Sequence, residues 1–258
     1  MIEKKFELLY NKLNRREYVH PDPLEFLYGY DDIRDREIVG LVSASLAYGR
    51  VAQILKSVSS ILVHMGPKPS VYLEETSFET LKMSLKGFTH RFATGEKMAA
   101  FLIGIKTVIR EFGSLEECFN VGLDKAEHTV FSGLSFFAEK IRNYCPVCPG
   151  HLVPVPGRMS ACKRFNLYFR WMVRHDAVDP GGWKSCSPSG LIIPLDIHMY
   201  RICLQIGFTK RRSADMKTAL EITREFRKIS PQDPVRYDFS ITRLGIRDDL
   251  NPDFFLKM

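Results

Sequence analysis

Segments with a helical period and recognisable caps follow one another along most of this 258-residue chain. Residues 94–113 begin at Thr94, carry apolar side chains on one broad face and end at Gly113. The quartets SLEE (114–117) and DKAE (124–127) have capping-box spacing, in which a short side chain and a glutamate satisfy each other's free amides. No segment alternates apolar and polar residues as a half-buried strand would. These capping and spacing signals predict an all-α fold with about ten helices.

The same signals predict three more helices and one irregular segment. Helices are expected over 35–49, 213–230 and 233–245, the last with Asp233 as its N-cap. The apolar run SGLIIPLD (189–196) contains a proline and stands alone, which favours an extended loop over a strand.

The domain organisation follows from length and from one proline-rich region. The chain is long enough for one large domain or two small ones, and it has no internal repeat, low-complexity tract or linker. Residues 143–163 contain four prolines and two glycines, and they form either a hinge between two helical lobes or a long ordered loop. We expect a single unit over residues 1–258, undivided or two-lobed, with a lysine-bearing region at about 145–207.

Composition and charge narrow the class of partner. The chain is 45% hydrophobic, which excludes a disordered protein, and its net charge is +7. Nucleic acid is the polyanion that such a surface meets most often. The amino terminus is charged every few residues, and no stretch approaches the roughly 20 apolar residues that span a bilayer. We therefore expect a cytoplasmic, nucleoid-associated protein whose six cysteines are reduced thiols.

The segment CKRFNLYFRWMVR leaves hardly any polar face, which predicts a helix buried on most sides. Lys163 stands at its start, where the helix dipole and the neighbouring Arg164 both disfavour another positive charge. A neutral lysine amine is a nucleophile that can form a Schiff base with a sugar or carbonyl carbon. The alternative is an ordinary surface lysine at a helix start.

A second candidate, Asp196, directly precedes the amphipathic segment 197–206, which Gly207 ends. This is the position of an N-cap, where aspartate is common for purely structural reasons. An aspartate at a helix end can also be an active-site carboxylate that activates water or steadies a developing cation. Both interpretations stay open on this segment alone.

Together these segments resemble the endonuclease III-type DNA glycosylases. KRFNLYF is similar to the K-T-A-N-V-V-L helix of that family, LDIHMYRI to its V-D-T-H-V-x-R-V segment, and LVSASLAYG to its L-L-S-A-Q-A-T helix. The positions that match are Lys163, Asn166, Asp196, His198, Arg201, Ser43, Ala44 and Ala47. The whole chain also resembles an uncharacterised bacterial family related to these enzymes.

The resemblance implies a fold, a reaction and a partner. In the helix-hairpin-helix (HhH-GPD) glycosylase superfamily the corresponding lysine and aspartate are the catalytic pair, which implies that role for Lys163 and Asp196. Their 33-residue separation is similar to the archaeal 8-oxoguanine DNA glycosylase branch. The implied fold is a two-lobed helical bundle, the implied partner is damaged double-stranded DNA, and no cofactor is implied. The implied reaction is base excision with strand cleavage through a Schiff base.

Several positions depart from the family pattern. The hairpin glycines before the lysine are replaced by MSAC (159–162), and the threonine of V-D-T-H is Ile197. The glutamine that fills the gap left by an extruded base is Ser45. No cysteine quartet stands at the carboxy terminus, so the iron–sulfur cluster of endonuclease III is not expected. These changes leave open a protein that keeps the fold and binds nucleic acid without excising a base.

Basic residues around the candidate pair predict contacts with DNA phosphates. Six basic residues against two acidic ones between Arg158 and Lys184 suggest a phosphate-facing edge, and TKRRS after the second helix suggests another. The alternative is solvated surface charge. The candidate DNA contacts are Arg158, Arg164, Arg170, Arg174, Lys210, Arg211 and Arg212, with Ser45, His198 and Arg201 from the matched motifs.

Two patterns resemble metal sites, but less closely than the motifs above resemble the glycosylase family. Cys145, Cys148 and His151 form C-x2-C-x2-H, which needs a fourth ligand to hold zinc, and a lone C-x-x-C is incomplete. His151 with the pair His175-Asp176 and with Asp196 loosely resembles a metal-dependent phosphohydrolase pattern. We expect no metal.

Overall fold

The computed structural model describes residues 2–157 and 160–246. These residues are mostly helical, which confirms the all-α prediction, and the only sheet among them is an antiparallel pair that places Thr89 opposite Thr94. The elements are α1 (Ile2–Leu13), η1 (Arg16–Tyr18), η2 (Pro23–Gly29), α2 (Ile33–Ser45), α3 (Val51–Met65), α4 (Pro69–Glu75), α5 (Phe78–Ser84), β1 (Thr89–His90), β2 (Ala93–Thr94), α6 (Gly95–Phe112), α7 (Leu115–Val121), α8 (Phe131–Tyr144), η3 (Gly150–Leu152), α9 (Lys163–Val173), η4 (Pro188–Gly190), α10 (Ile197–Gln205), α11 (Met216–Ile229) and α12 (Asp238–Ile246).

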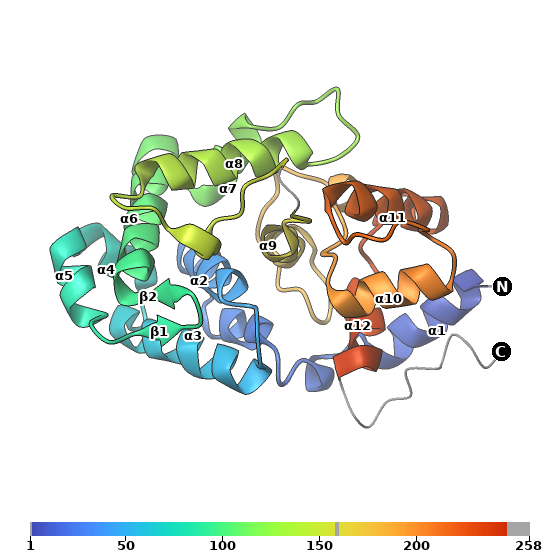
Figure 1. The fold of residues 1–258 in the computed structure, drawn as a ribbon, viewed down its shortest axis with the longest axis horizontal. Helices are drawn as coiled ribbons and strands as arrows, with labels where there is room; N and C mark the ends of the chain where they lie inside the picture. Colours follow the sequence, from blue (N-terminus) through green and yellow to red (C-terminus); the bar gives the residue numbers. More distant parts are fainter. Residues whose placement is uncertain (1, 158–159, 247–258) are drawn as a thin grey trace.

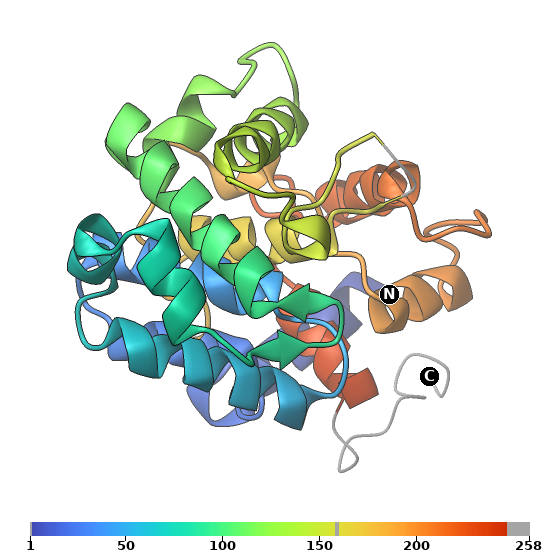
Figure 2. The same ribbon diagram turned by 60° about the vertical axis from the view of Figure 1, so that its left-hand side comes forward.

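The helices gather into two groups with α9 between them (Figure 1). Helices α2 to α8 form one group, in which α6 packs against α5, α7 and α8. Helices α1, α10, α11 and α12 lie on the other side in both ribbon views, and α12 packs against α1 and α10 (Figure 2). One hydrophobic cluster runs through both groups. Among the described helices, none is long and apolar enough to cross a membrane.

Helix α9 is buried as its sequence predicts. Phe165, Tyr168, Phe169 and Trp171 are fully buried, and burying each such side chain contributes roughly 1.5–3 kcal/mol or more. The Phe169 ring lies 4.4 Å from that of Phe119 on α7, centroid to centroid. Because α9 also packs against α2, its first residue is held in a fixed place between the two groups.

Most predicted helix ends are confirmed, but α2 ends at Ser45, four residues before the predicted end at Gly49. Thr94 caps α6 by accepting a hydrogen bond from the Lys97 amide, and Gly113 ends that helix with a left-handed φ of 90°. Ser114 accepts a hydrogen bond from the Glu117 amide, 3.0 Å away, at the start of α7. The run 189–196 contains the end of η4 and then extended chain, as expected of a loop.

Three predicted helix starts are wrong. Residues 124–127 form a turn in which Asp124 accepts from the Ala126 amide, 2.8 Å away, and the helix begins only at Phe131. Helix α2 is capped by Asp32 rather than Asp35, because Asp35 is buried and accepts a hydrogen bond from the Ser70 amide instead. The predicted cap Asp233 binds Arg174, and α12 begins five residues later, at Asp238.

Candidate functional site

An open cavity of about 570 Å³ lies where five segments meet. The segments are the turn before η2, the loop from α2 into α3, the start of α9, the start of α10 and α12. Its volume is within the range of sites that bind small molecules, about 300–1,000 Å³. The lining residues are Pro21, Asp22, Pro23, Ala47, Tyr48, Gly49, Val51, Ile54, Lys163, Leu167, Leu195, Asp196, Ile197, His198, Arg243 and Gly245.

Lys163 is the first residue of α9 and is half-buried. The turn before it is tightly held: the Asn166 side-chain amide donates to the Ala161 carbonyl at 3.0 Å, and the Cys162 amide donates to the Ser160 hydroxyl at 3.0 Å. Cys162 has a φ of 49°, a left-handed conformation that only a small fraction of non-glycine residues adopt. The match at Asn166 therefore has a structural explanation, because this side chain fixes the backbone from which Lys163 enters the cavity.

Asp196 is the N-cap of α10, as its position predicts. Its Oδ1 accepts a hydrogen bond from the Met199 amide at 2.8 Å. The cap fixes the carboxylate at the cavity wall, and the N-terminal end of a helix favours a negative charge there. The structural and the functional interpretations are thus compatible, since one carboxylate can cap the helix and line the cavity.

His198 is the second residue of α10, lines the cavity and packs against Gly245 of α12. A Cβ atom added at Gly245 would clash with His198 Nδ1, so the glycine leaves the space that the imidazole occupies. We predicted Gly245 as a helix stop, whereas α12 continues through it to Ile246. The close approach of the imidazole is a further reason for a glycine at this position, one residue before the end of α12.

Two charged residues of α12 were missed by the sequence interpretation. Asp238 is buried next to Arg170, and its Oδ1 has no hydrogen-bond partner among the described residues. Burial raises the pKa of Asp238 to about 6 against the attraction of Arg170, and the charges of Asp196 and Lys163 also act on it, in opposite directions. Arg243 lines the cavity itself. The available signal is the presence of two charged residues in an otherwise uncharged helix.

Tyr48 forms another part of the wall and is braced from behind by His90. The Tyr48 hydroxyl donates to the His90 carbonyl at 3.0 Å, and His90 Nε2 lies 3.1 Å from the Tyr48 carbonyl oxygen. His90 Nδ1 lies 2.9 Å from Ser57 Oγ, and burial lowers the pKa of the imidazole. This network fixes the loop that carries Tyr48 into the cavity.

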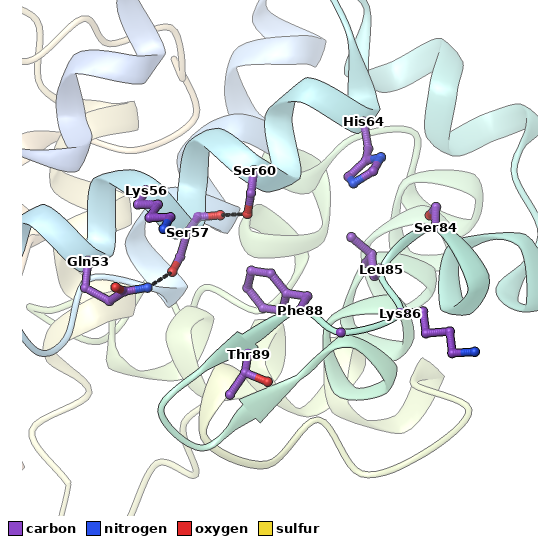
Figure 3. A pocket seen from close by; sticks show the side chains of 11 residues that line it. Gln53, Lys56, Ser57, Ser60, His64, Ser84, Leu85, Lys86, Phe88 and Thr89 are labelled. Carbon is purple, nitrogen blue, oxygen red and sulfur yellow. Dashed lines mark hydrogen bonds between the residues drawn. The ribbon is translucent and has the colours of Figure 1, made fainter.

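Ser57 also lines a second cavity, of about 390 Å³, on the other side of this network. Figure 3 shows its polar side chains along α3, where Gln53 Nε2 donates to Ser57 Oγ at 3.2 Å. A third, wider cavity of about 1010 Å³ is lined by the 123–130 loop, the loop around η4, and α11. Neither contains a predicted catalytic or DNA-contacting residue, so the cavity at Lys163 is the candidate site.

The predicted phosphate-facing roles of Arg170 and Arg174 are wrong. Both side chains are only 3–4% exposed. Arg170 binds Asp179 at 3.0 Å and also Asp238, and Arg174 binds Asp176 at 2.8 Å and Asp233 at 2.9 Å, and also Asp179. A guanidinium that is enclosed by carboxylates cannot reach a DNA phosphate. These arginines are therefore structural ion pairs that join α9 to the loop after it and to the region of α12.

Ser45 is also corrected as a DNA contact. Its side chain is fully buried, because α2 packs against α9, so it cannot enter a DNA duplex. Arg164 makes contacts within the protein. It donates hydrogen bonds to the Ser45 carbonyl at 2.7 Å and to the His151 carbonyl. Its guanidinium lies 5.0 Å from the Tyr48 ring centroid. It supports the cavity wall more than it faces solvent.

The remaining predicted contacts differ in exposure. Arg211 binds Asp215 at 2.9 Å and Thr218 at 2.8 Å. Arg201, Lys210 and Arg212 are exposed. Arg158 lies outside the described residues.

The metal candidates are not brought together. Cys145 donates to the Ile141 carbonyl, Cys148 is exposed near Arg142, and the exposed His151 ring lies against Phe92. His175 and Asp176 are held by the Pro180 carbonyl and by Arg174. In the part of the chain that the structure describes, no group of three or more His, Cys, Asp or Glu side chains is arranged to hold a metal ion.

The geometry defines a mostly helical protein with a cavity that carries a lysine and an aspartate at two helix ends. The chain belongs to the DUF2400 family, described as a protein of unknown function, whose model matches residues 22–247. That range contains every residue that lines the cavity except Pro21. No curated protein and no solved structure matches the chain.

Proposed function

We propose that the protein is a DNA glycosylase with an associated lyase step. The observation that supports this most strongly is that Lys163 and Asp196, which begin two different helices, line one open cavity of about 570 Å³. That space is in the range of small-molecule sites and suits a base that has been extruded from a duplex. The net charge of +7 is consistent with a polyanionic partner. On this account the protein acts on damaged DNA in the cytoplasm.

Lys163 is the nucleophile in this proposal. Its neutral amine bonds to C1′ of the extruded nucleotide as the glycosidic bond breaks, and the base leaves with the bonding electron pair and takes up a proton. The C1′–O4′ bond then breaks, the amine proton passes to O4′, and a Schiff base forms between the lysine and C1′. Loss of a proton from C2′ forms a C2′–C3′ double bond and expels the 3′ phosphate. Extrusion of the base costs a few kcal/mol, and less for a poorly paired lesion.

Asp196 steadies the positive charge that develops on the sugar and exchanges protons with the reacting groups. Its place as the cap of α10 keeps the carboxylate fixed while the substrate changes. The exposed cations Arg201, Lys210 and Arg212 are proposed to contact DNA phosphates. Arg170 and Arg174 have no part in this, because their charges are already neutralised inside the protein.

A second candidate function is nucleic-acid binding without base excision. The observation that favours it is the burial of Ser45, which leaves no side chain at that position to fill the gap of an extruded base. In this alternative, Lys163 is a phosphate contact and Asp196 is only a helix cap.

The test is a glycosylase and strand-cleavage assay on duplexes that carry 8-oxoguanine, uracil, an oxidised pyrimidine or an abasic site. The wild-type protein should process at least one of them, and Lys163→Ala should lose about 100-fold or more of that rate. Lys56→Ala is the matched control, because Lys56 is an exposed lysine that lines a different cavity. If the wild type binds DNA in a salt-sensitive way but releases no base, the glycosylase proposal is contradicted and nucleic-acid binding without base excision is favoured.

A further inference from the structure

Arg243 is the most unusual side chain of the candidate site. It belongs to α12, lines the cavity with Lys163 and Asp196, and is only 2% exposed. Its Nη2 donates to Asp22 Oδ2, and its guanidinium lies over the Phe239 ring, 4.6 Å from the centroid. These two contacts fix the plane of the guanidinium at the cavity wall.

Two nitrogens of this guanidinium have no hydrogen-bond partner among the described residues. Nε and Nη1 of Arg243 are buried and make no hydrogen bond to any described residue. Arginine stays charged and offers five N–H donors, and a buried donor that is left unpaired costs about 1–3 kcal/mol. The neighbouring buried arginines differ, because Arg170 and Arg174 each bind at least two carboxylates. Neither nitrogen is open to solvent in the described conformation, so a ligand in the cavity pairs with them only when the wall shifts to admit it.

We infer that Arg243 is a specificity-determining residue, which donates a hydrogen bond from Nε or Nη1 to a carbonyl oxygen of the extruded base. This inference rests on the proposed function and deepens it. The preferred bases are those that present a carbonyl oxygen to the site, as guanine-type and uracil-type lesions do. A base whose facing edge is an amino group leaves the donors unpaired and is bound less well.

Asp22 has a supporting part in this arrangement. It caps η2 by accepting a hydrogen bond from the Leu24 amide at 3.0 Å, and its other oxygen accepts from Arg243. The pair therefore connects the turn before η2 to α12 across the cavity wall. Because Nη2 is already used, the base is read by the remaining donors of a guanidinium that cannot rotate freely.

The same donors can instead bind a phosphate oxygen of the extruded nucleotide. The two sources of the acceptor oxygen are distinguished by an abasic duplex, which keeps the phosphates and the sugar but has no base. A residue that reads the base matters for base-bearing duplexes only, whereas a phosphate contact matters equally for both.

The experiment compares Arg243→Lys with the wild type on duplexes of one sequence that carry 8-oxoguanine, uracil or an abasic site. Lysine keeps a positive charge opposite Asp22 but lacks the Nε and Nη1 donors, and a melting curve shows whether the variant is folded. Arg236→Lys is the matched control, because Arg236 binds Glu7 at 3.3 Å and does not line the cavity. The readout is the rate of borohydride-trapped adduct formation.

Arg243→Lys should lose about 10- to 100-fold of the rate on the better of the two base-bearing duplexes, and no more than about threefold on the abasic duplex. If the rate falls equally on the base-bearing and the abasic duplexes, or falls on neither, the inference is overturned while the glycosylase proposal stays intact. If the wild type forms no adduct with any of the three duplexes, the proposed function fails and this inference fails with it.

Discussion

Lys163 and Asp196 are 33 residues apart in the sequence, and each marks the start of a helix, α9 and α10, at the wall of one cavity. The two helix starts bring an amine and a carboxylate to the same wall. The proposed reaction uses the amine as the nucleophile and the carboxylate to exchange protons.

Asp196→Asn separates the chemical role of this residue from its structural role. Asparagine is as good an N-cap as aspartate, so the melting temperature should change by no more than about 2 °C. The amide carries no negative charge and cannot exchange a proton, so the rate of base excision should fall by about 10²- to 10⁴-fold. Melting curves and single-turnover rates give the two quantities.

Asp32→Asn is the control for this substitution, because Asp32 also caps a helix, α2, by accepting from the Arg34 amide, but does not line the cavity. It should leave the rate unchanged. A loss of activity that matches a loss of stability in Asp196→Asn would show that the aspartate is only a cap.

The exposed cations predict a particular response to salt. Substitution of Arg201, Lys210 or Arg212 by alanine should lower the slope of log affinity against log salt by about 0.9 for each phosphate contact that is lost. Arg211→Ala should change the slope less, because Asp215 and Thr218 already bind that guanidinium. Fluorescence anisotropy titrations at several salt concentrations measure this. Equal slopes in all variants would exclude this surface from the DNA interface.

Arg170 is predicted to stabilise the folded protein through its buried ion pairs. Arg170→Met leaves Asp238 and Asp179 short of a buried partner and should lower the free energy of unfolding by about 3–5 kcal/mol. Arg110→Met removes an exposed ion pair with Glu74 and should lower the free energy of unfolding far less, because solvent screens that pair. Urea denaturation of both variants gives the comparison, and similar losses in the two would contradict the structural assignment of Arg170.

The buried carboxyl group of Glu37 predicts how the stability of the protein changes with pH. It is 1% exposed and accepts hydrogen bonds from the Leu115 amide at 3.1 Å and from Trp183 Nε1 at 3.2 Å. Burial nevertheless raises its pKa from 4.5 to about 7. Between these two values the folded protein holds a proton that the unfolded chain has released, so stability falls as the pH rises through this window.

The free energy of unfolding of the wild type should therefore fall by up to roughly 3 kcal/mol between pH 4.5 and 7 from this group alone. Glu37→Gln lacks this contribution, and the difference between the two proteins isolates it from the other carboxylates. Urea denaturation at pH 5 and pH 7.5 measures it. Parallel pH profiles for the two proteins would show that Glu37 titrates normally.

Local signals predicted those parts of the fold whose partners are close in sequence. Asp196 and Ser114 each cap a helix through an amide three residues further on, and both caps are confirmed. The ion pair between Arg170 and Asp238 spans 68 residues, and no local pattern contains it. For this reason the sequence predicts that Arg170 and Arg174 face DNA phosphates, whereas both lie in the interior.

The candidate site was predictable in part for the same reason. Lys163, Asp196 and His198 stand at helix starts within short motifs, and the structure places all three at one cavity. Arg243 belongs to that cavity only because the end of α12 packs against the start of α10, and the burial of Ser45 depends on how α2 meets α9. Both are consequences of long-range packing.

Borohydride trapping tests the central claim most directly, because it captures the Schiff base between an amine and C1′. Wild-type protein and Lys163→Ala are each incubated with lesion-bearing and abasic duplexes under borohydride, and the adduct is digested and its modified residue identified by mass spectrometry. We predict a covalent adduct with the wild type only, attached at Lys163. An adduct that forms equally with Lys163→Ala, or no adduct with any duplex despite DNA binding, would contradict the assignment of Lys163 as the nucleophile.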